Sequence, residues 1–279
     1  MNEYFYGWYL KCQSDIQTLA IIPAIHGAGR KSTCSIQFIT DNHVYMLTLP
    51  GEKFCRKRDN ILIEKNKFGK KGIYLEINEP DLCINGKIKF GALRPIKYDI
   101  MGPFSFVPFM QCRHSVWSMR HPIRGMVYIN GQKIHFDGGV GYWEGDRGRS
   151  FPKEYAWTQC IFPKGSFMLS VADIPLAGVH FTGIIGVVLW KGKEYRLATY
   201  LGAKAVEKSD GRLRIVQGKL EFEARLLEQT KHPLKAPDRG SMIRTIHESV
   251  ACRAYYRFCI NDQVIFAFET EKASFEYEY

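Results

Sequence analysis

Short segments in which apolar and polar residues alternate are the feature that most constrains this chain. The clearest are CSIQFIT (34–40), HVYMLTL (43–49), GIYLEIN (72–78) and GKIKFGAL (86–93), with turn sequences such as TDN and ING between them. Successive side chains of a strand point to opposite faces, so a period of two indicates strands with one buried face. The second half of the chain repeats this pattern, and convincing amphipathic helices are scarce. We therefore predict an all-β protein.

The length of the chain and its many turns favour closed antiparallel sheets. The 279 residues, of which 46% are hydrophobic, are enough for one large β domain or two ordinary ones. The sequence GKIKF, from Gly86, has an echo in GKLEF, from Gly218, which indicates two related β units in tandem. Because barrels remove exposed strand edges, we expect one antiparallel barrel over residues 1–163 and a second over residues 164–279.

The charge of the chain bears on its partners and on its location. A net charge of +11 favours anionic partners such as nucleic acid, acidic lipid headgroups or phosphorylated ligands. Basic clusters at 53–58 and 65–71 read most simply as solvated turn tips, and with no recognition helix or aromatic RNA-binding motif beside them we expect no nucleic-acid partner. Transient contact with a membrane surface stays open. With no secretory signal pattern, and no apolar run longer than 183–190, we expect a cytoplasmic protein.

Several chemical motifs are incomplete. The cysteines form no CxxC pair, and in a chain of this length they favour free, mostly buried thiols in a reducing compartment. The segment HGAGRKST (26–33) departs from a phosphate loop at Arg30, where a glycine is needed before the lysine. Cys112, His114 and His121 have no fourth ligand at a useful spacing, so we expect no metal site. The serine of HSV has no flanking glycines, which gives a hydrolase triad no support.

Residues 141–155, GYWEGDRGRSFPKEY, combine acids and cations with large aromatic rings. This combination is typical either of a salt-bridged corner or of an acid in an apolar pocket. Strand alternation places Tyr142, Glu144 and Asp146 on one face and Trp143 on the other.

A bulge or a turn would change this arrangement. A bulge at Gly145 would bring the neighbouring tryptophan to the acidic face. The sequence DRGR is also a good turn, in which Asp146 would pair with Arg147 or Arg149, and a flanking arginine lowers the pKa of a carboxyl group. Both the structural and the catalytic interpretation of Asp146 stay open at this point.

Five segments carry a resemblance to a known family: FYGWYLK near the start, IIPAI followed by CSIQFI, HSVWSM (114–119), the long GYWEGDRGRSFPKEYAWTQC (141–160), and APDRGSMIRTIHES (236–249). In these segments the chain resembles the tocopherol cyclase family and, through a shared architecture, the carotenoid hydratases and the wider two-domain lipocalin-like group. The resemblance implies two tandem lipocalin-like β-barrels and acid-catalysed chemistry on prenyl double bonds. Arg147 stands where the family usually has tryptophan, so the substrate of the plant enzymes is not assumed.

Such chemistry needs a carboxylic acid that keeps its proton until it reacts. Burial among apolar groups can raise the pKa of a carboxyl group by up to about 3–5 units. The tertiary cation formed from the alkene is stabilised by aromatic faces, at about 0.5–2 kcal/mol each. A substrate hydroxyl or a water molecule then captures the cation, so exclusion of water separates a cyclase from a hydratase.

The resemblance and the alternation together assign candidate roles. We predict Asp146 as the acid, with Glu144 as its rival, and His114 as the group that holds Asp146 in position or accepts the final proton; a plain core histidine is the alternative. Candidate rings that face the cation are Trp143, Trp117, Tyr142 and Trp157. No metal or organic cofactor is implied.

The sequence thus predicts a tocopherol cyclase-like enzyme that protonates and cyclises a hydrophobic prenylated or terpenoid small molecule. A hydratase of an isoprenoid double bond and a non-catalytic carrier of an isoprenoid or other lipid are the alternatives. A third interpretation makes one barrel a protein-interaction module without a cavity. The oligomeric state is not specified by the sequence.

Overall fold

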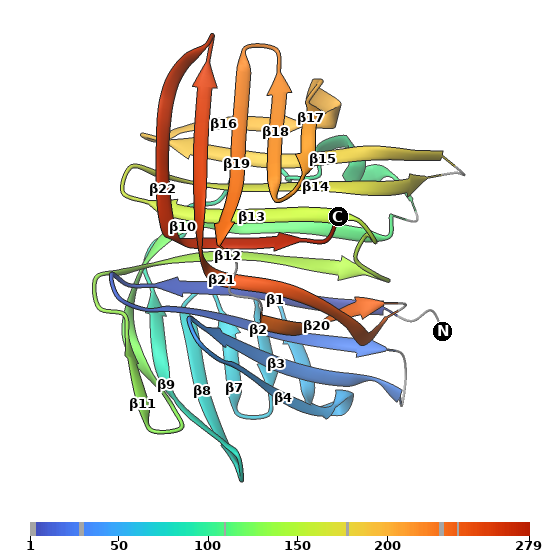
Figure 1. The fold of residues 1–279 in the computed structure, drawn as a ribbon. Coiled ribbons are helices and arrows are strands. Elements are labelled where there is room, and N and C mark those ends of the chain that lie inside the picture. The colour runs from blue at the N-terminus through green and yellow to red at the C-terminus, as the bar shows by residue number, and fades with distance from the viewer. Residues whose placement is uncertain (1–3, 28–30, 109, 177–178, 229–231, 239) are drawn as a thin grey trace. The chain divides into compact units, whose positions relative to one another are not determined.

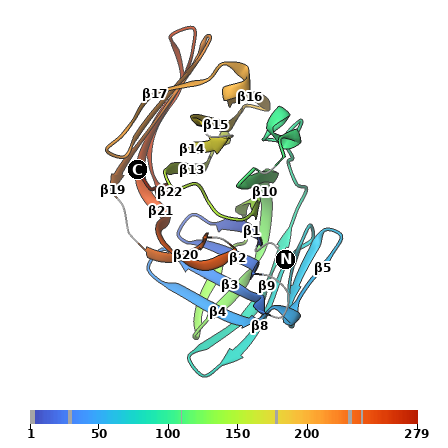
Figure 2. The same ribbon diagram turned by 90° about the vertical axis from the view of Figure 1, so that its right-hand side faces the viewer.

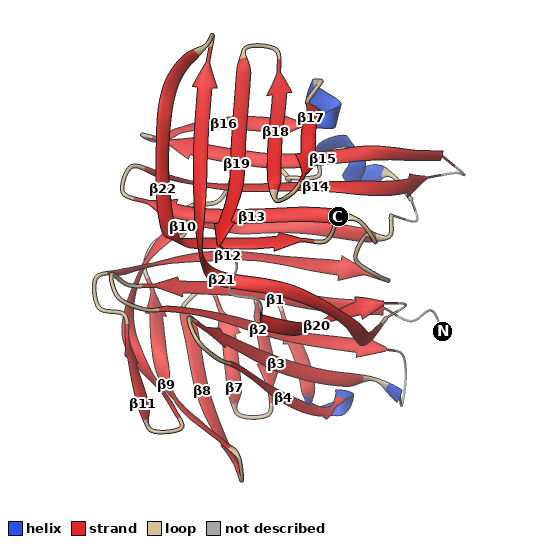
Figure 3. Ribbon diagram, in the orientation of Figure 1, coloured by secondary structure: helices blue, strands red, loops and turns tan. Residues whose placement is uncertain are grey.

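Antiparallel strands make up nearly all of the regular structure (Figure 3). The computed structural model describes residues 4–27, 31–108, 110–176, 179–228, 232–238 and 240–279. Within these ranges, helical structure is limited to short 3-10 turns, among them η2 (Gly51–Lys53), η3 (Gly102–Phe106) and η4 (Thr199–Leu201). The predicted all-β, lipocalin-like antiparallel fold is confirmed.

The first sheet has 12 strands in the order β4-β3-β2-β1-β12-β10-β9-β8-β7-β6-β5, and β11 pairs with β10 beside this path (Figure 1). Its strands are β1 (Tyr4–Gln13), β2 (Thr18–Gly27), β3 (Thr33–Thr40), β4 (Val44–Pro50), β5 (Phe54–Lys57), β6 (Asn60–Ile63), β7 (Asn66–Gly69), β8 (Gly72–Glu79), β9 (Leu82–Phe90), β10 (Cys112–Ile129), β11 (Gln132–His135) and β12 (Gly139–Gly148).

The second sheet has 10 strands in the order β16-β15-β14-β13-β22-β21-β19-β18-β17, and β20 pairs with β21 beside this path. Its strands are β13 (Tyr155–Phe162), β14 (Gly165–Leu176), β15 (Val179–Trp190), β16 (Lys193–Ala198), β17 (Lys204–Ser209), β18 (Arg212–Gln217), β19 (Leu220–Glu228), β20 (His232–Asp238), β21 (Ser241–Ile260) and β22 (Gln263–Tyr277).

The two sheets repeat one connection pattern. In each, four strands follow one another in sequence order, the later strands return from the opposite edge, and the last strand inserts beside the first one, as β12 does beside β1 and β22 beside β13. The echo noted in the sequence falls on strands that correspond in this pattern, since Gly86 lies in β9 and Gly218 lies in the turn that leads into β19. The structure therefore supports a duplication of the β unit.

Neither sheet closes into a full barrel. The path of the first sheet ends at β4 and at β5, and no ladder joins these two strands within the described residues. The sheet still curves around its core (Figure 2). Short edge strands are a common way to avoid edge-to-edge pairing, and the edge strand β5 has only 4 residues. The expectation of fully closed barrels is corrected in this respect.

Contacts divide the chain into two compact units that exchange segments. Unit 1 consists of Met1–Pro95, His114–Ser150 and Ala236–Arg244, and unit 2 of Ile96–Arg113, Phe151–Lys235 and Thr245–Tyr279. Each unit thus includes a segment from the other half of the chain. The predicted domain boundary between residues 163 and 164 stays a prediction, because contacts do not test which segment folds alone.

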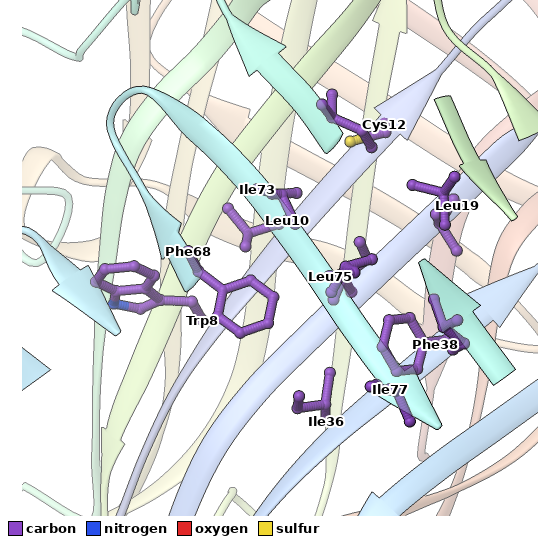
Figure 4. Packing of buried hydrophobic residues seen from close by; sticks show 14 of the residues in the cluster. Trp8, Leu10, Cys12, Leu19, Ile36, Phe38, Phe68, Ile73, Leu75 and Ile77 are labelled. Atoms are coloured by element: carbon purple, nitrogen blue, oxygen red, sulfur yellow. The ribbon is translucent and has the colours of Figure 1, made fainter. Parts of the chain in front are cut away.

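The core of unit 1 lies on one face of its sheet (Figure 4). Every second residue of β1 points into it, namely Tyr6, Trp8, Leu10 and Cys12, and side chains of β2 to β4 and β6 to β12 complete it. This alternation leaves the intervening residues of β1 on the opposite face of the sheet.

Unit 2 has a separate core that is rich in aromatic rings, including Phe167, Phe222 and Tyr256. The buried hydroxyl of Tyr256 lies 2.6 Å from Thr158 Oγ1, so this polar group has a hydrogen-bond partner inside the core.

The cysteines agree with the sequence prediction. All eight are free thiols, and Cys12, Cys34, Cys160, Cys252 and Cys259 are buried. No helix in the described part of the chain has the length and apolar character needed to cross a membrane.

Candidate functional site

Strands β1 and β12 place the acidic residues of the 141–155 segment. Their antiparallel ladder runs without a register shift from Phe5 opposite Gly148 to Gln13 opposite Val140. Because no residue is inserted, the alternation along β12 is regular, and it brings Tyr142, Glu144 and Asp146 to the same face. That face is the one opposite the core of unit 1.

Gly145 has a packing role in this ladder. A Cβ atom at Gly145 would collide with the backbone carbonyl oxygen of Gly7 and would lie 2.9 Å from the rings of both Trp8 and Trp117. The glycine therefore lets β1 and two indole rings approach β12 closely, and it introduces no bulge.

His114, near the start of β10, lies between the two carboxyl groups of β12. Strands β10 and β12 are neighbours in the sheet. The Nδ1 atom of His114 lies 2.9 Å from Asp146 Oδ1, and its Nε2 atom lies 3.0 Å from Glu144 Oε2. The hydroxyl of Tyr142 donates a hydrogen bond to the same oxygen of Glu144. Four residues of the sequence prediction thus form one connected cluster.

Burial differs within this cluster. The side chains of His114 and Glu144 are only 9% and 5% exposed, and that of Asp146 is 23% exposed. A ligand can therefore reach Asp146 more easily than its rival Glu144.

The electrostatics of the cluster favour a protonated ring. Burial lowers the pKa of His114, but the charges of Asp146 and Glu144 and the hydrogen bonds to both outweigh it, so the pKa of His114 lies well above its usual range. Burial, together with the charge of Glu144 and the hydrogen bond to it, raises the pKa of the Tyr142 phenol well above its usual range. Both ring nitrogens of His114 then donate, each to one carboxylate, and Tyr142 stays neutral.

Lys11 belongs to the same face of the sheet, and the sequence analysis did not single it out. It lies directly opposite Tyr142 in the ladder, while Tyr9 lies opposite Glu144. Lys11 is only 1% exposed, which is rare for lysine. The only signal in the sequence is a lysine within the largely apolar segment FYGWYLK.

Two of the predicted tryptophans, Trp143 and Trp117, lie on the face of the sheet that points away from the carboxyl groups. Trp143 and Trp117 stack on each other with ring centroids 5.3 Å apart, and Trp8 lies 4.8 Å from Trp143, all on the core side of the sheet. Trp157 lies in β13 of unit 2 and is buried. Tyr142 contacts the acidic cluster through Glu144, and a cation-facing role for the three tryptophans stays a prediction.

A small polar pocket lies at the opposite end of the same sheet. Its volume is about 150 Å³, and turns β1–β2, β3–β4 and β10–β11 form it through residues such as Thr18, Asp41, His43 and Lys133. The acidic cluster does not line this pocket. Among the described residues, no group of three or more His, Cys, Asp or Glu side chains is arranged to hold a metal ion.

Comparisons with known proteins identify the fold. No family model matches the chain, and no curated protein matches it in sequence. Solved structures do match. CghA has a TM-score of 0.63 at 9% identity, over 99% of this chain and 88% of its own.

Two further structures match at a similar level. A candidate AttH protein from Nitrosomonas europaea has a TM-score of 0.57 at 8% identity, over 100% of this chain and 93% of its own. Kievitone hydratase from Nectria haematococca has a TM-score of 0.56 at 8% identity, over 99% of this chain and 89% of its own. At such low identity, these matches show a common fold along the whole chain.

Proposed function

We propose that this protein is an acid–base enzyme that adds water to a carbon–carbon double bond of a hydrophobic prenyl or terpenoid molecule. The observation that carries the proposal is the buried imidazole of His114 between the carboxyl groups of Asp146 and Glu144. Buried clusters of titratable groups with a perturbed pKa are typical of catalytic sites. One protein of the same fold is by name a hydratase, which favours hydration over cyclisation.

We propose a role for each member of the cluster, and the geometry supports these roles. Asp146 is the proton donor because it is the most exposed of the three. His114 supplies the proton through the hydrogen bond from Nδ1 to Asp146. Glu144, which accepts hydrogen bonds from Nε2 and from Tyr142, stabilises and orients the charged ring.

The reaction balances without a further reactant. The His114 proton moves to Asp146, which transfers it to one alkene carbon and leaves a cation on the other. The oxygen of a water molecule bonds to that carbon, and the proton released by this water returns to Asp146 and then to His114. One alkene and one water thus give one alcohol, and the cluster regains its starting protonation state.

Lys11 is a candidate for the charge balance of this site, because it lies on β1 opposite Tyr142. With His114 protonated, the two carboxylates leave the three residues with one net negative charge, and a cation on the neighbouring strand β1 would offset it. We propose Lys11 as a residue that stabilises the ionised cluster without contact with the substrate.

Isotope labelling tests the proposal. Mass spectrometry of lipids that co-purify with the protein first identifies the prenyl compound. The protein is then incubated with this compound in ¹⁸O-labelled water. Hydration adds the mass of labelled water to the product, whereas the tocopherol cyclase-like alternative gives an isomer of unchanged mass.

Asp146→Asn is expected to bind the same lipid and to lose turnover by a factor of about 10² or more. The matched control is Asp137→Asn, because Asp137 also pairs with a histidine, His135, at 3.1 Å, but both are exposed. If the wild-type protein binds lipid but shows no turnover, it is a carrier. If turnover survives Asp146→Asn, Asp146 is not the acid.

A further inference from the structure

Four cations lie on the outer face of strands β7 to β10 in unit 1. Lys67 lies opposite Tyr74, Tyr74 opposite Lys87, and Lys89 opposite Arg124 in the ladders. Residues directly opposite each other in antiparallel strands share a face. All five are exposed, and the intervening residues point to the core, so this face is directed to solvent. We call it the cationic face.

The cations of this face have no acidic partner. Of the ion pairs formed by the described residues, none includes Lys67, Lys87, Lys89 or Arg124.

The acids nearby are engaged elsewhere. Glu76 accepts from Lys65 at 2.6 Å and from the Tyr74 hydroxyl at 2.7 Å. Asp137 accepts from the backbone of Gly125 at 2.9 Å and pairs with His135.

The sheet of unit 2 also brings like charges together, since Arg212 lies opposite Arg225, but there each cation has an acidic partner: Glu207 lies 3.9 Å from Arg212, and Glu223 pairs with Arg225. There, exposed arginines are paired across strands with glutamates, as in Arg214–Glu221 at 3.1 Å and Arg253–Glu269 at 3.0 Å. Like charges directly opposite each other destabilise a sheet, and Lys89 and Arg124 are such a pair. Unit 1 therefore keeps an unfavourable concentration of charge that an anionic partner would relieve.

We propose that the cationic face is a docking surface for membranes that contain anionic lipids. Neighbouring strands are about 4.8 Å apart, so the cations are distributed over a broad surface that can contact several headgroups at once. Tyr74, which is 42% exposed between Lys67 and Lys87, has the amphipathic ring favoured at the headgroup level.

A nucleic acid suits this face less well than a lipid surface. The described part of unit 1 has no helix to enter a groove, and the face has the single exposed ring of Tyr74 for stacking, with its hydroxyl bonded to Glu76. The proposal does not depend on the proposed reaction, although a membrane is where a hydrophobic substrate of the proposed class would be found.

Vesicle sedimentation tests this proposal. The protein is mixed with vesicles of phosphatidylcholine alone or with added phosphatidylserine, at low and high salt. We expect binding only to the anionic vesicles and weaker binding at high salt. The triple variant Lys87→Gln, Lys89→Gln, Arg124→Gln should bind about 100-fold more weakly, since each juxtamembrane cation contributes about a five-fold factor.

The matched control is Lys164→Gln, Lys204→Gln, Lys219→Gln, which removes the same charge from exposed positions of unit 2. It should retain most of the binding. If both triple variants lose binding equally, net charge alone explains the effect and the proposal fails. It also fails if the protein does not bind anionic vesicles, or binds a nucleic-acid duplex instead. The assay contains no substrate, and Asp146→Asn should bind vesicles like the wild type, so this proposal and the proposed function fail separately.

Discussion

His121, in β10, makes the stability of unit 1 sensitive to acid. Its side chain is 1% exposed, and its Nδ1 atom lies 2.9 Å from Ser118 Oγ. Burial lowers the pKa of His121 from 6.5 to about 4. Because this pKa is lower in the folded state, the unfolded chain takes up a proton first as the pH falls. The contribution of the neutral ring to the free energy of unfolding is fully present above pH 6.5. It is lost progressively as the pH falls to about 4.

The magnitude follows from the difference between the two pKa values. The difference between 6.5 and about 4, at about 1.36 kcal/mol for each pKa unit, corresponds to about 3 kcal/mol of lost stability at the acid limit. At about pH 5, roughly 2 kcal/mol of this is lost. Burial also lowers the pKa of His26 to about 4. A substitution at His121 leaves His26 unchanged, so its contribution is the same in both proteins.

The test compares the wild type with His121→Asn, which keeps a donor near Ser118 but does not titrate. Urea unfolding is followed by the fluorescence of Trp8, Trp117 and Trp143, which all lie in unit 1. Whatever the variant costs at pH 8, its disadvantage should shrink by roughly 2 kcal/mol at about pH 5. Ser118→Ala, which leaves the ring in place, should keep the wild-type dependence on pH. If wild type and His121→Asn lose stability in parallel between these pH values, the reasoning is wrong.

Two further predictions concern the candidate site. The raised pKa of His114 implies a contribution to stability that is present below pH 6.5 and is lost as the pH rises through the folded-state pKa. Glu144→Gln removes one of the two charges and should lower this pKa, which an NMR titration of the imidazole would measure; an unchanged titration would contradict the role of Glu144. Gly145→Ala should destabilise unit 1 by about 1–3 kcal/mol, because its Cβ would meet the Gly7 carbonyl and the ring of Trp117. Urea unfolding measures this cost. If the variant is as stable as the wild type, the strands can move apart enough to accommodate the Cβ atom.

The strand content and the facing of side chains could be predicted because both depend on local alternation. The period of two along β12 placed Glu144 and Asp146 together with Tyr142 and directed Trp143 away from them, and the structure has this arrangement. From the sequence, Gly145 could either introduce a bulge or leave the alternation regular. Only the approach of β1 shows that this glycine provides close packing.

The pairing of His114 with the carboxyl groups depends on contacts between distant parts of the chain. His114 lies 32 residues before Asp146 and 30 before Glu144. The resemblance selected His114, but no periodicity in the sequence shows that it lies between both acids. The burial of Lys11 likewise depends on what covers that face of the sheet, which a strand pattern does not encode.

The sequence alone determined the class of fold, since alternating side chains and tight turns leave antiparallel sheets as the way to bury one face of each strand. Only the tertiary structure decided that the sheets stay open and that segments 96–113 and 236–244 join the unit of the other half. It also decided that Lys65, just before β7, pairs with an acid while Lys67, within β7, forms no ion pair among the described residues. The physical reason is that edge pairing, segment exchange and charge neutralisation are set by residues far apart in the chain, whereas a sequence pattern describes neighbours.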